Sequence, residues 1–142
     1  MSKMQENRNH SAFMIFYHFI FVVKYRKKLL SIKKYDELVK QVLLDSQTKN
    51  IKIEKMESDQ DHIHVLVSAS PNISPRQIAS LLKQRTTFEL WQSYPMDLKK
   101  EFWKEHKFWS PSYFVASIGS VSKEAIERYI QNQRNSTSYP KG

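Results

Sequence analysis

The run of aromatic and β-branched residues from Phe13 to Val23 constrains the fold more than any other stretch of this sequence. Rings and β-branched side chains favour an extended chain, and a run with so few polar residues predicts a long buried strand. His18 interrupts the run, which is also too short to cross a bilayer as a helix. Because the first ten residues do not read as a signal peptide, we expect a cytoplasmic protein without a membrane segment.

Hydrophobic periodicity after this strand predicts a helix and then a hairpin. Two alternating segments, 51–57 and 62–68, flank a polar turn at 58–61, which is typical of two antiparallel strands. Before them, residues 31–48 are predicted to form an amphipathic helix because apolar side chains recur at helical spacing. These side chains are Ile32, Tyr35, Leu38, Val39, Val42 and Leu43.

A second helix is predicted to begin at Ser74-Pro75-Arg76-Gln77, where Ser caps, Pro occupies the first helical position and Gln reaches back. We expect its buried face to carry Ile78, Leu81, Leu82 and Phe88. Residues 94–107 are basic and aromatic, and we expect an irregular surface loop there. A strand over 109–118 ends at Gly119, and Ser122 caps a last helix over 123–133.

This order of elements predicts an α+β fold with a ferredoxin-like (RRM-like) antiparallel sheet. Two helices cover one face of such a sheet, the other face stays open, and the last helix is an addition to the fold. With 142 residues, no internal repeat and no linker, the chain is expected to form one domain over 1–142. Residues 1–11 and 135–142 are expected to be loose tails.

Composition favours a nucleic-acid partner and excludes several classes of site. Lys and Arg number 23 against 14 Asp and Glu, a formal charge of +9, and the chain has seven Tyr, eight Phe and three Trp. Cations interleaved with aromatic rings suit single-stranded nucleic acid. The absence of cysteine excludes disulfides and thiolate chemistry, and two glycines are too few for a phosphate-binding loop.

The pair His62 and His64 is the sharpest candidate site. Residues two apart on a strand point to the same face, so the two imidazoles would converge while Ile63 enters the core. Two neutral imidazoles side by side supply half of a metal site. Histidine pairs at this spacing also arise by chance, so two structural histidines remain an alternative.

A second candidate lies on the last predicted helix, where Tyr129 and Gln133 are four residues apart and share one face. Tyr129 would be a nucleophile, and Gln133 a neutral oxygen ligand beside it. The alternative is structural: the tyrosine borders the apolar face of Ala125, Ile126 and Ile130, and the glutamine is solvated.

The ordered set of these motifs resembles the small single-tyrosine HUH transposases of insertion sequences. Any one of them is weak evidence for the family, but together they cover about residues 13–134. Gln84, which follows Lys83 where relatives often carry Gly, is a departure away from the catalytic positions. The matching pieces are Tyr17-His18, Lys24-Tyr25-Arg26, Asp61-His62-Ile63-His64-Val65, Trp109 with Ser112-Tyr113-Phe114-Val115, Gly119, and Tyr129-Ile130 with Gln133.

This resemblance implies a divalent metal, Mg²⁺ or Mn²⁺, bound by His62, His64 and Gln133. It implies that Tyr129 attacks a phosphodiester of hairpin-bearing single-stranded DNA and leaves a 5′-phosphotyrosine link and a free 3′-hydroxyl. It also implies a homodimer in which the tyrosine helix of one subunit meets the histidines of the other. On charge, the expected DNA contacts are Lys24, Arg26, Lys27, Lys28 and Arg85.

Three alternatives stay open on the sequence. A domesticated, repeat-associated relative would cut and rejoin hairpins without moving an element. A non-enzymatic module that binds single-stranded nucleic acid explains the charge and the rings, but gives the two histidines and Tyr129 no joint role. In a basic domain without a metal, the two histidines would be structural.

Overall fold

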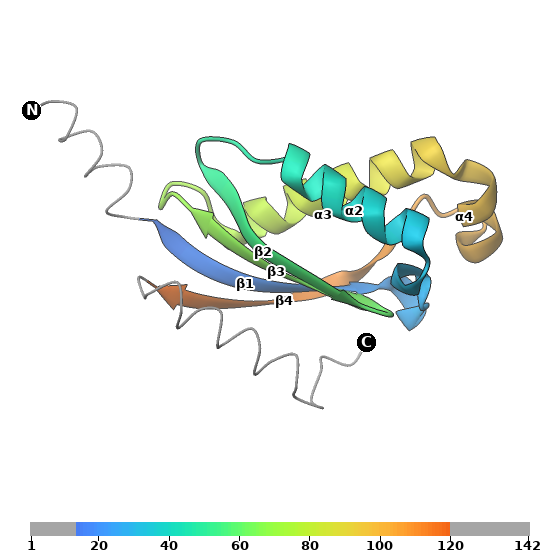
Figure 1. Cartoon of the computed structure of the whole chain (residues 1–142), viewed down its shortest axis with the longest axis horizontal. Helices are drawn as coiled ribbons and strands as arrows, with labels where there is room; N and C mark the ends of the chain where they lie inside the picture. Colours follow the sequence, from blue (N-terminus) through green and yellow to red (C-terminus); the bar gives the residue numbers. More distant parts are fainter. Residues whose placement is uncertain (1–13, 120–142) are drawn as a thin grey trace, which may run out of the picture.

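The computed structural model describes residues 14–119, which form a four-stranded antiparallel sheet with helices on one face (Figure 1). The strands are β1 (Ile15–Val23), β2 (Ile51–Asp59), β3 (His62–Ala69) and β4 (Trp109–Gly119), in the sheet order β2-β3-β1-β4. This order and the two helices that pack on the sheet confirm the predicted ferredoxin-like α+β fold. The helix predicted over 123–133 lies outside the described residues.

The apolar run identified in the sequence becomes β1, which lies between β3 and β4. Every residue of β1 from Tyr17 to Val23 is buried, on both faces of the strand. Its odd-numbered side chains Phe19 and Phe21 pack in the main core beneath the helices, together with Ile63 and Val65 of β3. The even-numbered side chains of β1 point to the opposite face, because successive residues of a strand alternate.

Two helices cover the core face of the sheet: α2 (Lys33–Asp45) and α3 (Pro75–Ser93) (Figure 1). The start of α3 is a capping box, as predicted. The Ser74 hydroxyl accepts from the Gln77 backbone N–H (3.1 Å), and the Gln77 side-chain oxygen accepts from the Ser74 N–H (2.8 Å). No helix in the described part of the chain is long and apolar enough to span a membrane.

The prediction of an irregular loop over 94–107 is wrong, because a third helix, α4 (Pro95–Phe102), forms within this segment. Pro95 at the helix start supplies a preset φ, and Asp97 in the first turn and Lys100 in the last turn complement the helix dipole. Leu98 and Phe102 lie one turn apart on the same side and are both buried. Two apolar residues, Leu98 and Phe102, are too few to reveal a helical repeat in the sequence.

The prediction that Phe88 belongs to the buried face of α3 is also wrong. Its side chain is 59% exposed, whereas Leu82, Thr86 and Leu90 are buried. Phe88 follows Thr86 by two residues, which places it on the opposite side of the helix. A large ring is therefore exposed on the outer surface of α3.

Loss of the capping box is expected to destabilise the fold measurably. Ser74→Ala removes the acceptor for the Gln77 N–H, and we expect the free energy of unfolding in urea to fall by about 1 kcal/mol. Ser80→Ala, at an exposed position of the same helix, is the matched control and should not lower it. Equal losses in the two variants would contradict the role of the cap.

Candidate functional site

His62 and His64 lie together on the face of the sheet opposite α2 and α3. Their ring centroids are 5.1 Å apart, and both side chains are buried. Ile63, between them, packs in the main core on the other side of the strand. The strand geometry predicted for these three residues is confirmed, while the role of the two histidines as metal ligands stays a prediction.

A third histidine joins this pair from the neighbouring strand. His18 of β1 lies beside His64, with 2.9 Å between His18 Nε2 and His64 Nδ1 and the two rings stacked at 21°. The register of β1 and β3 pairs Ile20 with His64, so His18 is the diagonal neighbour on the same face. The sequence contained His18 in a matching motif but gave it no role, because that role depends on strand register.

The His18–His64 contact bears on which nitrogen of His64 can bind a metal. Burial lowers the pKa of His18 to about 4, so its imidazole is neutral at pH 7 and Nε2 can accept a hydrogen bond. If the His64 Nδ1–H donates to His18, then His64 Nε2 carries the lone pair. This is how a neighbouring acceptor orients a metal-binding histidine and sets its tautomer.

His62 is oriented by the residue that precedes it. Its Nδ1 lies 2.8 Å from Asp61 Oδ1, and Asp61 Oδ2 accepts from Arg26 Nε at 3.0 Å. Burial favours a raised pKa for Asp61, but the hydrogen bonds with His62 and Arg26 outweigh it and hold that pKa below its usual value. Asp61 is therefore a carboxylate that accepts the His62 Nδ1–H, which makes Nε2 the basic nitrogen of His62.

A strained turn brings Arg26 to Asp61. Directly after β1, the chain forms the 3₁₀ helix η1 (Lys24–Arg26), in which Tyr25 and Arg26 adopt φ values of 62° and 54°. Positive φ is uncommon for residues other than glycine and costs free energy. Two contacts with Asp61 stabilise the turn. The backbone N–H of Val23, at its start, donates to the Asp61 carbonyl (2.8 Å), and Arg26 forms an ion pair with the Asp61 side chain.

Four of the predicted DNA contacts lie in this turn or directly after it, and three of these four have acidic partners. Lys24 pairs with Glu105 at 3.4 Å and Lys27 with Glu101 at 3.2 Å. Both pairs are partly exposed at the surface and contribute little to stability. Lys28 and Arg85 are exposed, the latter on α3. Contact of these residues with DNA stays a prediction.

The donor set fits part of a divalent metal site. His62 and His64 supply two imidazoles whose Nδ1 atoms each face a neighbouring side chain, and neutral imidazole is a ligand of divalent transition metals. Within residues 14–119, no group of three His, Asp or Glu side chains is arranged to hold a metal. The predicted third ligand Gln133 and the predicted nucleophile Tyr129 lie outside the described residues.

Sequence comparison relates almost the whole chain to transposases. The profile of the family described as "Transposase IS200 like" matches residues 11–133. The ISDra2 transposase TnpA of Deinococcus radiodurans is 30% identical over 134 residues, which cover 94% of this chain and 93% of that protein. The transposase for insertion sequence element IS200 of Salmonella typhimurium is 27% identical over 124 residues, 87% of this chain and 80% of the relative.

Comparison of structures agrees. A crystal structure from Deinococcus radiodurans R1, described as that of a transposase, has a TM-score of 0.65 and 29% identity, covering 85% of this chain and 92% of the other. A REP-associated tyrosine transposase bound to a REP hairpin has a TM-score of 0.55, covering 84% and 67%. At 12% identity, this second likeness is one of fold alone.

The tautomer of His62 is a direct test of the Asp61 contact. We expect ¹⁵N NMR of the imidazoles at pH 7, without metal, to show a proton on His62 Nδ1, because Nδ1 donates to Asp61. Asp61→Ala removes the acceptor and should return His62 towards the Nε2-protonated form. A wild-type His62 protonated only at Nε2 would contradict the geometry described above.

Proposed function

We propose that this chain, which belongs to the IS200-like family of transposases, cuts and rejoins single-stranded DNA. The cuts would fall at the hairpin-marked ends of an insertion sequence. In this proposal a covalent 5′-phosphotyrosine link to Tyr129 connects the two steps. The observation that carries it is the pair of imidazoles at the start of β3, each with its Nδ1 within hydrogen-bond distance of a neighbouring side chain. Metal-binding histidines usually have such a neighbour on the ring nitrogen that does not face the metal.

His62 and His64, with Gln133, would hold a divalent metal. Transposases of this family are in general metal-dependent. When bound, such an ion polarises the phosphate, neutralises developing charge and orients the leaving group. The residues of this chain contribute the orientation: Asp61 fixes His62, and His18 fixes His64. We propose Mg²⁺ or Mn²⁺ as the ion.

Tyr129 would be the nucleophile. Its phenol oxygen attacks the phosphorus, the bond from phosphorus to the 3′-oxygen breaks, and that oxygen leaves as a 3′-hydroxyl after taking up a proton. A free phenol has a pKa of about 10, so the attack needs a site that stabilises the phenolate. Because the ester retains the energy of the broken bond, a 3′-hydroxyl can later attack it and rejoin the strands.

The substrate and the assembly belong to the same proposal. The net charge of +9 and the cations around η1 favour a polyanion, and the structural neighbour bound to a REP hairpin is consistent with a folded single strand. We propose a homodimer in which the tyrosine helix of one subunit serves the histidines of the other, acting in the cytoplasm. In a domesticated relative, the same chemistry would act on repeat hairpins.

A covalent-adduct assay tests the proposal. Incubation with labelled, hairpin-bearing single strands from a relative's element ends and Mn²⁺ should give protein-linked DNA on a denaturing gel. Tyr129→Phe should abolish the adduct, because it removes the attacking oxygen. Tyr113→Phe, which removes a phenol hydroxyl from β4, is the matched control and should retain it. An adduct that persists in Tyr129→Phe would exclude this nucleophile.

The two histidines should separate cleavage from binding. We expect His64→Ala to lower strand cleavage at least about 100-fold while changing the dissociation constant for the uncut strand only slightly, since it removes a metal ligand. Ser68→Ala, on the same face of β3, should leave cleavage near wild type. Parallel losses of binding and cleavage in His64→Ala would favour a non-enzymatic binding module.

A further inference from the structure

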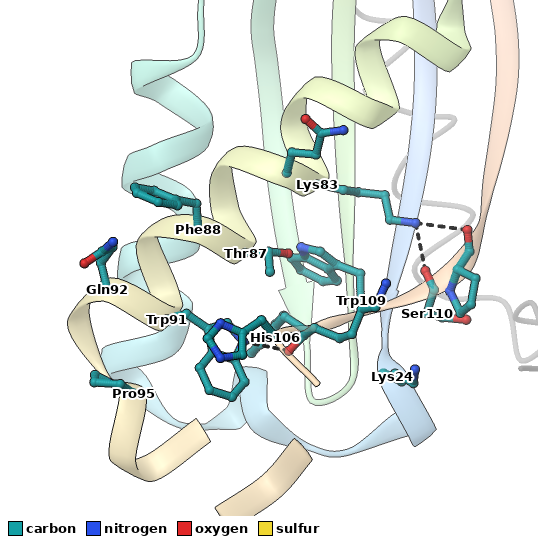
Figure 2. Close-up of a pocket in the computed structure, with 14 residues that line it drawn as sticks. Lys24, Lys83, Thr87, Phe88, Trp91, Gln92, Pro95, His106, Trp109 and Ser110 are labelled. Atoms are coloured by element: carbon teal, nitrogen blue, oxygen red, sulfur yellow. Dashed lines mark hydrogen bonds between the residues drawn. The ribbon is translucent and has the colours of Figure 1, made fainter. Parts of the chain in front are cut away.

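A pocket of about 680 Å³ opens between α3 and the segment that leads into β4 (Figure 2). We call it the α3–β4 pocket. Its volume is in the range of sites that hold a small organic ligand, and so is sufficient for one nucleotide. The part of its lining used below comprises Lys24, Lys83, Phe88, Trp91, Lys107 and Trp109.

The walls of the α3–β4 pocket are joined by hydrogen bonds, so its shape is preformed. Lys83 reaches from α3 to the carbonyl oxygens of Ser110 (2.7 Å) and Pro111 (3.1 Å), as Figure 2 shows. The indole N–H of Trp91 donates to the Lys107 carbonyl at 2.9 Å, and that of Trp109 to Thr86 at 2.8 Å. A preformed pocket loses little entropy when a ligand binds.

The pocket is positively charged. Three lysines line it, of which Lys24 pairs with Glu105, and no Asp or Glu is among its lining residues in the described chain. Burial, with the nearby charge of Lys107, lowers the pKa of Lys83. Like charges brought this close attract an anion, and the DNA phosphate is the anion that the proposed function supplies.

Aromatic rings provide the surface on which a base can stack. Phe88 is 59% exposed at the rim of the pocket, on the outer side of α3. Deeper in, Trp91 is 8% exposed and stacks on His106 with 4.3 Å between ring centroids. Gln84 and Gln92 also line the pocket and offer amide groups to the edge of a base.

The α3–β4 pocket reaches the end of the sheet where the histidines lie. Lys24 lines it, and the Lys24 N–H donates to the carbonyl of Phe108 at 2.9 Å. The preceding residue, Val23, donates to the carbonyl of Asp61, next to His62. The end of β1 therefore contacts both the segment that lines the pocket and the residue that precedes His62.

We infer that the α3–β4 pocket binds an unpaired base of the single-stranded DNA that the protein cuts, with the base against Phe88 and its phosphates on the lysines. This inference rests on the proposed function. It assigns a function to the exposed ring of Phe88, which the core does not use.

Fluorescence anisotropy with the full chain tests the inference. The probe is a labelled single strand of mixed sequence, about 20 nucleotides long, which exceeds the usual site size of a binding domain. We expect Phe88→Ala to raise the dissociation constant about 5- to 100-fold, and Phe88→Trp to restore binding, because stacking accepts any base. Trp103→Ala, at a 77% exposed ring that does not line the pocket, is the matched control and should bind like wild type.

A second probe of the same length, with abasic sites in place of bases, separates stacking from charge. Wild type and Phe88→Ala should bind it equally, while Lys107→Gln should lower the salt dependence of binding for both probes. If Phe88→Ala binds the normal strand as tightly as wild type, the inference is overturned, whereas a retained Tyr129 adduct leaves the proposed function intact. A wild type that neither binds strands nor forms the adduct overturns both.

Discussion

The pairing of β1 with β3 is the constraint on which the rest of the structure depends. It places the most apolar strand in the interior of the sheet, where both of its faces are buried. On one face the odd-numbered residues build the core beneath α2 and α3. On the other, the same register sets His18 against His64. A slip of one residue would exchange the two faces and destroy the core and the histidine cluster together.

The turn after β1 connects three features of the molecule. Arg26 binds Asp61, which orients His62, and Lys24 lines the α3–β4 pocket. At the end of β1, the backbone N–H groups of Val23 and Lys24 donate to the carbonyl oxygens of Asp61 and Phe108. The positive φ values of Tyr25 and Arg26 carry a cost that the surrounding contacts offset. A DNA strand bound across this turn would therefore contact residues that also position the proposed metal ligands.

The strands, the two long helices and the shared face of His62 and His64 could be predicted from the sequence, because the periodicity of a strand or a helix is a local signal. The alternation around His62 and His64 gave both the strand and the shared face of the rings, and the Ser74–Gln77 capping box marked the start of α3. The contact of His18 with His64 needs the register of two strands that are far apart in the sequence. The exposure of Phe88 depends on which side of α3 meets the sheet. The apolar character of the Phe88 side chain alone does not reveal that side.

A Mn²⁺ titration, followed by the loss of the free-ion EPR signal, tests directly whether His62 and His64 form an oriented metal site. We expect wild type to bind Mn²⁺ and His18→Phe to lower the affinity about 10- to 100-fold, because a group that orients a ligand is lost. His64→Ala should lower it further, and His106→Ala, in the α3–β4 pocket, should not change it. Unchanged Mn²⁺ affinity in His64→Ala would exclude His64 as a metal ligand.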